Sequence, residues 1–257
     1  MVKKDIRMEY KRRISEIRQA FRTEKKCVKQ AYKDNLHDYY EKTGKLPANP
    51  PKRSVLEEVG NSITHGLGAL LSILGFLAMI FEADRASEYV GASLYFAGLF
   101  IMLTISCLYH AFPHGSKVKR LFRRFDYCCI YLLIGATFAP FLLCSVGGGY
   151  GITFLVLQWV VIALGVTLIS IFGPNRLRFL HNTLYILLGW SALLLIPQIL
   201  HEHIGFFLFV LLGGVIYSLG IIPFALNKKH THFIWHFFVL AGAAVQWVGI
   251  YVYLYVF

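Results

Sequence analysis

Long apolar runs fill the chain after about residue 60, and short polar segments separate them. Seven of these runs are close to the ~20 residues that a helix needs to span a bilayer. They cover residues 62–82, 89–112, 126–146, 150–172, 180–198, 204–226 and 233–256. Because the connections between the runs are short, consecutive helices should pack as antiparallel neighbours. The pattern predicts an all-α fold, a bundle of seven transmembrane helices.

Residues 5–40 follow a different pattern, in which apolar residues recur every three or four positions among lysine, arginine and glutamate. The apolar positions are Ile6, Tyr10, Ile14, Ile17, Phe21, Val28 and Tyr32. This spacing predicts an amphipathic helix. Such a helix can lie on the inner leaflet, pair with a second copy as a short coiled coil, or be fully solvated. The basic excess, and Glu24 in the middle of the heptad pattern, favour the leaflet.

Composition agrees with a membrane protein, because 56% of the residues are hydrophobic and the mean hydropathy is +0.55. The net charge of +12 is concentrated in residues 1–53, which hold 16 Lys/Arg against 7 Asp/Glu. We therefore divide the chain into a basic N-terminal region, residues 1–53, and a membrane domain, residues 54–257. A basic segment just before a membrane helix favours anionic lipid over nucleic acid as its partner.

We expect no removable signal peptide, and the five cysteines lack the spacing of a disulfide framework or a thiolate metal site.

Charge on the connections predicts the orientation in the membrane. After residue 53, every Lys and Arg except Arg85 falls on the second, fourth and sixth connections, whereas the first is acidic and the third neutral. By the positive-inside rule, the N-terminus is cytoplasmic and the C-terminus lies outside. The expected location is the plasma membrane, which the chain crosses several times.

Four ionisable residues, His110, Asp126, His232 and His236, lie near the predicted cytoplasmic ends of the apolar runs. A charged side chain in lipid costs ~2.5 to 3.5 kcal/mol on insertion scales, so a partner is expected. His232 and His236 are four residues apart on one helix face, the spacing with which two consecutive turns hold one metal ion. Three imidazoles and one water complete a tetrahedral zinc site, and Asp126 would orient or deprotonate that water.

Simpler explanations exist for each residue, since histidines often occupy the membrane interface and an acid in a first turn complements the helix dipole. Four such residues in one layer favour a metal site. His65 occupies the same layer with Asn61 and Glu58, and it is either a competing ligand or part of a polar cluster between helix ends. His114 and His230 have loop neighbours and are expected to be solvated.

At these residues the chain resembles the hemolysin III family, the bacterial branch of the progestin and adipoQ receptor superfamily. The resemblance covers about residues 55–257. It rests on Glu57-Glu58-x-x-Asn61-x-x-Thr64-His65-Gly66, on Ser106-x-x-x-His110, on Phe125-Asp126-Tyr127 followed by Gly135-Ala136-Thr137-Phe138-Ala139-Pro140, and on His232-x-x-x-His236-x-x-Val239. One departure is Gln246, ten residues after His236, where many relatives are expected to carry another histidine.

The resemblance implies seven membrane helices with the N-terminus inside, and a zinc ion bound by His110, His232 and His236. It also places Asp126 at the zinc-bound water, with Ser106 beside it. It further implies kinship with membrane hydrolases such as the alkaline ceramidases, which cleave amide bonds of lipids.

The predicted function is therefore zinc-dependent hydrolysis of lipid amide or ester bonds, with a role in membrane lipid homeostasis. Asp126 would manage the proton, and Ser106 would hydrogen-bond the oxyanion or the water. One alternative is a non-enzymatic sensor of membrane state with a structural zinc. Another is a pore-forming hemolysin, which the scarcity of charged residues in the apolar runs does not favour. The residues leave the substrate and the oligomeric state open.

Overall fold

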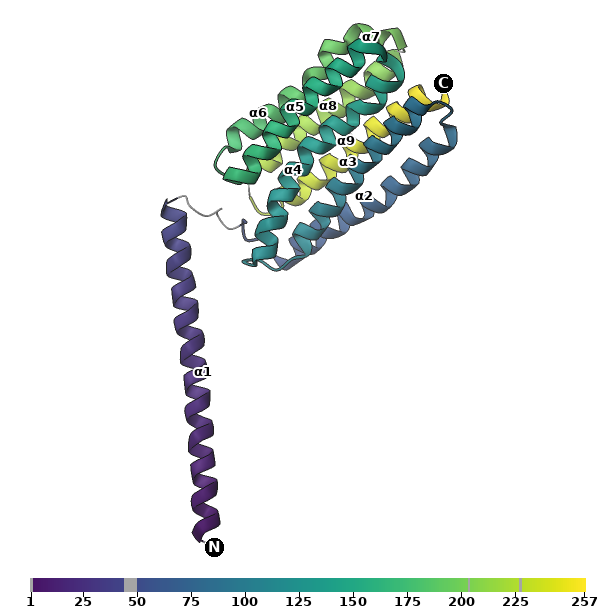
Figure 1. Ribbon diagram of the computed structural model, residues 1–257. Helices are drawn as coiled ribbons and strands as arrows, with labels where there is room; N and C mark the ends of the chain where they lie inside the picture. The colour runs from purple at the N-terminus through teal and green to yellow at the C-terminus, as the bar shows by residue number, and fades with distance from the viewer. Residues whose placement is uncertain (1, 44–49, 203, 227) are drawn as a thin grey trace. The chain divides into compact units, whose positions relative to one another are not determined.

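The computed structural model describes residues 2–43, 50–202, 204–226 and 228–257. The chain forms two compact units, residues 1–48 and residues 49–257. In the first unit, one long helix, α1 (Val2–Thr43), contains the helix predicted for residues 5–40 (Figure 1). The roles assigned to residues 1–53 and 54–257, and the contact of α1 with lipid, stay predictions.

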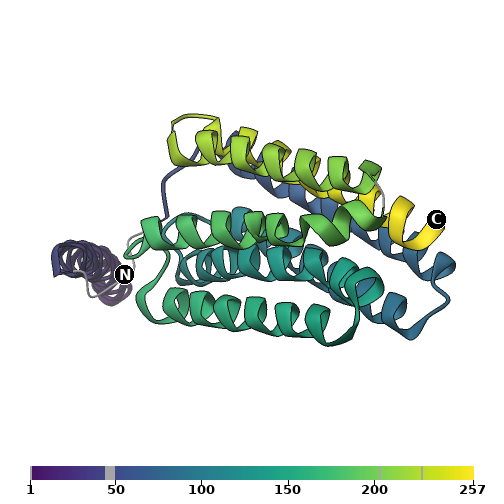
Figure 2. The same cartoon turned by 90° about the horizontal axis from the view of Figure 1, so that it is seen from above.

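The second unit is a bundle of seven helical spans, each long and apolar enough to cross a membrane (Figure 2). Within the described residues, the spans are α2 (Val55–Glu82), α3 (Ala86–Ala111), α4 (Lys117–Pro140) continued by η1 (Phe141–Val146), α5 (Gly148–Phe172), α6 (Arg178–Trp190) with η2 (Ser191–Leu195) and α7 (Ile196–Glu202), α8 (Ile204–Leu226), and α9 (Thr231–Tyr251) continued by η3 (Val252–Val256). No strand occurs in the described part of the chain. The predicted all-α seven-span fold is confirmed, and its orientation in the membrane stays a prediction.

Two helices begin well before their apolar runs, because serine side chains cap them. The Ser54 hydroxyl accepts a hydrogen bond from the Glu57 N–H, and the Glu57 carboxylate accepts one from the Ser54 N–H. This capping box starts α2 about two turns before residue 62. Ser116 caps α4 in a similar way, accepting from the Lys119 N–H. The basic cluster that the charge analysis placed on the second connection is therefore the first two turns of α4.

Close helix packing at the centre of the bundle brings the polar helix ends together. α2 packs against both α3 and α9, and α3 packs against α4. Gly98 of α3 permits this approach, because a Cβ there would lie 3.1 Å from the Leu132 carbonyl oxygen of α4. Farther along the core, the Tyr95 hydroxyl donates to the Ala243 carbonyl and joins α3 to α9. The start of α2, the end of α3 and the start of α9 consequently meet at one end of the bundle.

Candidate metal centre

Three histidines from two distant helices converge at this end of the bundle. His110 lies in the last turn of α3, and His232 and His236 lie on successive turns at the start of α9. Their ring centroids are 4.9 to 5.1 Å apart, and one nitrogen from each ring lies within 4.8 Å of the others. His110 and His236 are buried, and His232 is half-buried. We call these residues the histidine triad; together they could bind a metal ion.

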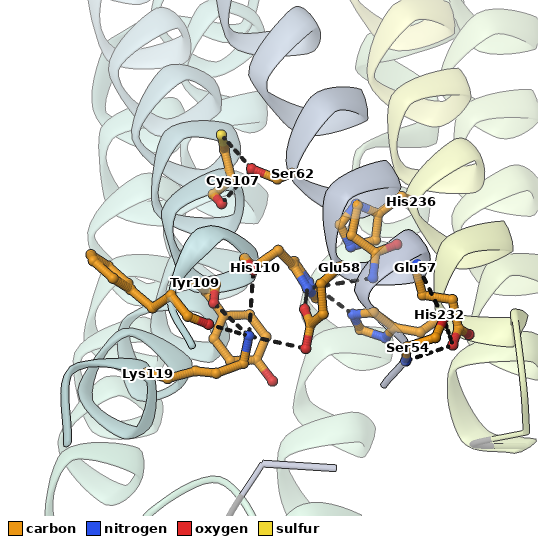
Figure 3. A network of polar contacts seen from close by, with 12 residues as sticks. Ser54, Glu57, Glu58, Ser62, Cys107, Tyr109, His110, Lys119, His232 and His236 are labelled. Carbon is orange, nitrogen blue, oxygen red and sulfur yellow. Dashed lines mark hydrogen bonds and ion pairs between the residues drawn. The ribbon is translucent and has the colours of Figure 1, made fainter. Parts of the chain in front are cut away.

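The carboxylate of Glu58, one helix away, fixes the orientation of the His110 ring. His110 Nδ1 lies 2.6 Å from Glu58 Oε2 (Figure 3). A carboxylate can only accept a hydrogen bond, so the proton is on Nδ1 and the Nε2 lone pair faces the triad. The second Glu58 oxygen lies 3.0 Å from the Nζ atom of Lys119. Glu58 therefore joins His110 to α4 as well as to α2.

Lys119 is fully buried, and its ammonium group binds backbone carbonyls at the C-terminal end of α3. Its Nζ atom donates to the carbonyl oxygens of Tyr109 and Phe112, each at 3.0 Å. Carbonyls in the last turn of a helix lack partners within that helix, and a cation there also complements the helix dipole. Lys119 thus caps the C-terminal end of α3, and it also holds the Glu58 carboxylate in place.

α2 also supplies contacts to His236. The Thr64 hydroxyl lies 3.2 Å from His236 Nδ1, which leaves Nε2 to face the other two rings. On its other side, His236 stacks against the ring of His65, with centroids 3.7 Å apart and an interplanar angle of 18°. His65 is not part of the metal-binding group, and neither of its ring nitrogens has a hydrogen-bond partner among the described residues. His65 therefore packs against His236, a predicted metal ligand, and is not itself in the metal-binding group.

The start of α9 is fixed by the capping residue of α2. Glu57 Oε1 accepts a hydrogen bond from the backbone N–H of His230, which adopts a left-handed conformation with φ of 64°. The His230 ring itself is half-exposed and lies 3.7 Å from the same carboxylate. Because α9 begins at Thr231, this contact sets the position of His232 on its first turn.

One pair of imidazole nitrogens has the separation of two ligands on a shared metal ion. His232 Nε2 lies 3.2 Å from His110 Nε2. Two ligands of a tetrahedral zinc, each at ~2.0 to 2.1 Å, are separated by about 3.3 Å. Three neutral imidazoles without a thiolate are a donor set that zinc accepts, and they leave a fourth position open. The triad could therefore hold a metal ion, and zinc as that metal stays a prediction.

Asp126 and Ser106 lie next to the triad, although neither belongs to it. The Ser106 hydroxyl on α3 is within hydrogen-bonding reach of the Asp126 carboxylate on α4. Asp126 and His232 together line a polar cavity of about 430 Å³ at this end of the bundle. The cavity therefore borders the triad at its half-buried member, His232.

Comparison with known proteins places the membrane bundle in a family. A family model described as "Haemolysin-III related" matches residues 53–247. The chain belongs to the hemolysin III family. Hemolysin-3 of Bacillus cereus is 38% identical over 197 residues, which is 75% of this chain and 89% of the relative. The Hemolysin-3 homolog of Bacillus subtilis (strain 168) is 36% identical over 199 residues, 75% and 92% of the two chains.

More distant similarity extends beyond bacteria. Human monocyte to macrophage differentiation factor is 27% identical over 218 residues, which is 82% of this chain and 90% of that protein. Such relatives belong to the wider progestin and adipoQ receptor superfamily. Like the bacterial members of the hemolysin III family, the chain is a multi-pass protein of the plasma membrane.

Sequence spacing anticipated the residues of the triad but missed those that orient it. Glu58 and Asn61 were assigned only to a general polar cluster, and Lys119 and Thr64 received no role in the site. Ser54 is the sequence feature that predicts their position. It can cap a helix that starts at Val55, and such a helix places Glu58 and Thr64 at the depth of the histidines. His114 proved to contact the backbone, with Nε2 3.0 Å from the Pro50 carbonyl oxygen, and takes no part in the triad.

We expect Glu58→Gln to weaken metal binding by roughly 10- to 100-fold, because it removes the carboxylate that orients and polarises His110. The measurement is a competition titration of the purified protein with a zinc chelator of known affinity. Glu82→Gln is the matched control, since Glu82 is an exposed acid at the opposite end of the same helix. Equal affinities in the parent and Glu58→Gln would show that the carboxylate does not support the site.

Proposed function

We propose that this protein is a zinc-dependent hydrolase that cleaves amide or ester bonds of membrane lipids. The observation that carries the proposal is the triad itself: three imidazoles converge from α3 and α9, and the half-buried member faces a cavity that also contains Asp126. A structural zinc site has four protein ligands, whereas a catalytic one has three and an open position. The arrangement of the triad supports the second type.

The residues around the open position have the chemistry that hydrolysis needs. A zinc ion held by the triad would supply a Lewis acid that polarises a carbonyl and makes water a better nucleophile at neutral pH. Asp126 takes the proton of the attacking water and passes it to the nitrogen or oxygen of the leaving group as the bond breaks. Ser106 has one O–H to donate: in the free site it goes to the Asp126 carboxylate, and in the reaction it would turn to the carbonyl oxygen and stabilise the charge there.

A second cavity, which is apolar, supports a lipid as the substrate. It has a volume of about 130 Å³ and lies among α3, α4, α6, α8 and α9, with Met102, Tyr217, Phe224 and Trp235 in its lining. Phe224 also lines the polar cavity, and its ring centroid lies 6.1 Å from that of His232. An acyl chain fits the chemistry of the apolar side, and a headgroup fits that of the polar side. The bond to be cleaved would then lie near the triad.

The competing proposal is a structural zinc without turnover. It is favoured by the position of α2, which packs against both α3 and α9, because an ion bound to His110 and His236 would join α3 to α9 beside it. Under this proposal, removing zinc lowers thermal stability and no lipid product forms.

Turnover of lipid by the purified protein separates the two proposals. We expect ceramide-type amides or acyl esters in mixed micelles to yield free fatty acid, detected by mass spectrometry. A chelator should abolish the product, and added zinc should restore it. Loss of the metal without any change in turnover would contradict the hydrolase.

For the N-terminal unit, we propose that α1 rests on an anionic leaflet, since its exposed Tyr10, Ile17 and Phe21 lie on a helix rich in Lys and Arg. We expect an environment-sensitive dye at Phe21→Cys to shift to the blue in nanodiscs of anionic lipid but not of neutral lipid. A dye at Gln19→Cys, on another face of α1, is the control. Equal emission in both lipids would instead favour a solvated helix or a coiled coil.

A further inference from the structure

The polar cavity beside the triad has a positively charged lining that metal binding does not explain. Arg53, Arg123 and Arg178 line it, together with the amide of Asn175. These residues come from the segment before α2, from α4, from the connection between α5 and α6, and from the start of α6. Of the described residues in the lining, Asp126 is the one carboxylate. Three guanidinium groups against one carboxylate give the cavity a net positive charge.

The three arginines that line the cavity differ in what their guanidinium groups contact. Arg53 Nη1 is buried and has no hydrogen-bond partner within the described structure. Arg123 Nη2 donates to Asn175 Oδ1 at 2.7 Å, and its guanidinium lies 5.5 Å from the Tyr127 ring centroid. Arg178 lies 5.7 Å from the ring centroid of Phe224. An aromatic ring thus lies beside the guanidinium group of each of these two arginines.

A buried guanidinium N–H without an acceptor is unfavourable, and an anion in the cavity would satisfy it. Arginine presents its N–H groups as a planar fork, and phosphate oxygens match that fork with two parallel hydrogen bonds. Of the carboxylates nearby, Glu58 is already engaged by His110 and Lys119, and Asp126 brings a single negative charge against the three guanidinium groups. A cavity of about 430 Å³ is in the range of small-molecule sites, so it holds a phosphate with part of the group that carries it.

We propose that this cavity is a binding site for a phosphate group, held by Arg53, Arg123 and Arg178 next to the histidine triad. The phosphate can be the headgroup of a phosphomonoester lipid or free inorganic phosphate. The proposal concerns only the binding of phosphate, so it does not depend on the proposed hydrolysis. If both hold, they place a phosphate-bearing lipid with its headgroup at the arginines and its chain toward Phe224.

The test is a binding titration of the full-length protein in detergent by isothermal titration calorimetry. The probes are inorganic phosphate, dioctanoyl phosphatidic acid and dioctanoyl phosphatidylcholine. We expect the first two to bind, and the zwitterionic lipid to bind much more weakly. Arg53→Gln and Arg178→Gln should each weaken binding roughly tenfold or more, the effect of losing one charge-assisted contact. Arg176→Gln is the matched control, because Arg176 is two residues from Arg178 but lies over the Phe172 ring and is not among the residues that line the cavity.

Each result decides the proposal or the source of the phosphate. Tighter binding of phosphatidic acid than of inorganic phosphate identifies the lipid, and the reverse order identifies the free ion. Persistence of binding in His236→Ala shows that the arginines, and not a metal ion, hold the anion, whether or not zinc hydrolysis is correct. The proposal is overturned if neither phosphate probe binds, or if Arg176→Gln weakens binding as much as Arg178→Gln. Unchanged zinc content in the arginine variants shows that they are folded.

Discussion

Alanine in place of His110 or His236 should reduce bound zinc from about one ion per chain to nearly none. Each change removes one of three protein ligands, and the remaining two imidazoles cannot hold the ion at the affinity of a complete site. Elemental analysis by mass spectrometry on protein purified without added metal measures the effect. The loss should occur in both variants, because the two side chains come from different helices but contribute to one group.

Two further histidines serve as controls for this experiment. His201 is exposed near the opposite end of the fifth span, so His201→Ala should keep its zinc. His65→Ala is the more demanding comparison, since His65 stacks on His236 but is not part of the metal-binding group. It should retain most of the metal. Zinc at the parental level in His110→Ala would indicate that the histidines merely occupy the membrane interface. Complete loss of zinc in His65→Ala would indicate that His65 is a ligand.

Asp126→Asn should lower lipid turnover by roughly 10²- to 10⁴-fold while leaving the zinc content unchanged. The amide has nearly the same shape as the carboxylate and keeps the contact with Ser106, but it cannot accept the proton of the attacking water. Turnover is measured as release of fatty acid, alongside elemental analysis of the same preparation. Asp84→Asn, in the connection between α2 and α3, is the control. Loss of zinc together with activity would indicate that Asp126 is itself a ligand, contrary to the proposed role.

Hydropathy predicted the seven spans because the membrane requires about twenty apolar residues in each, whatever the neighbouring helices are. It could not predict where α2 and α4 begin. Their first turns are polar, and the caps formed by Ser54 and Ser116 start them before the apolar runs. The sequence therefore predicts Lys119 only as a basic residue of a connection and Glu58 only as part of a general polar cluster, although both residues contact the site.

The triad was predictable for a similar reason. The i, i+4 spacing of His232 and His236 is local, and His110 was placed at the same depth by counting spans. The contacts that orient these rings are not local, because Glu58 and Thr64 are brought to them by the packing of α2 against α3 and α9. No spacing rule within one helix reveals a partner on another helix.

The order of the ligands along the chain has a consequence for biogenesis. His110 belongs to the second span, whereas His232 and His236 belong to the last. A ribosome delivers the chain from its N-terminus, so most of the bundle is synthesised before two of the three ligands exist. If the triad binds a metal ion, a chain that stops before α9 would lack two of the three histidines, and metal loading would mark the molecules whose insertion is complete.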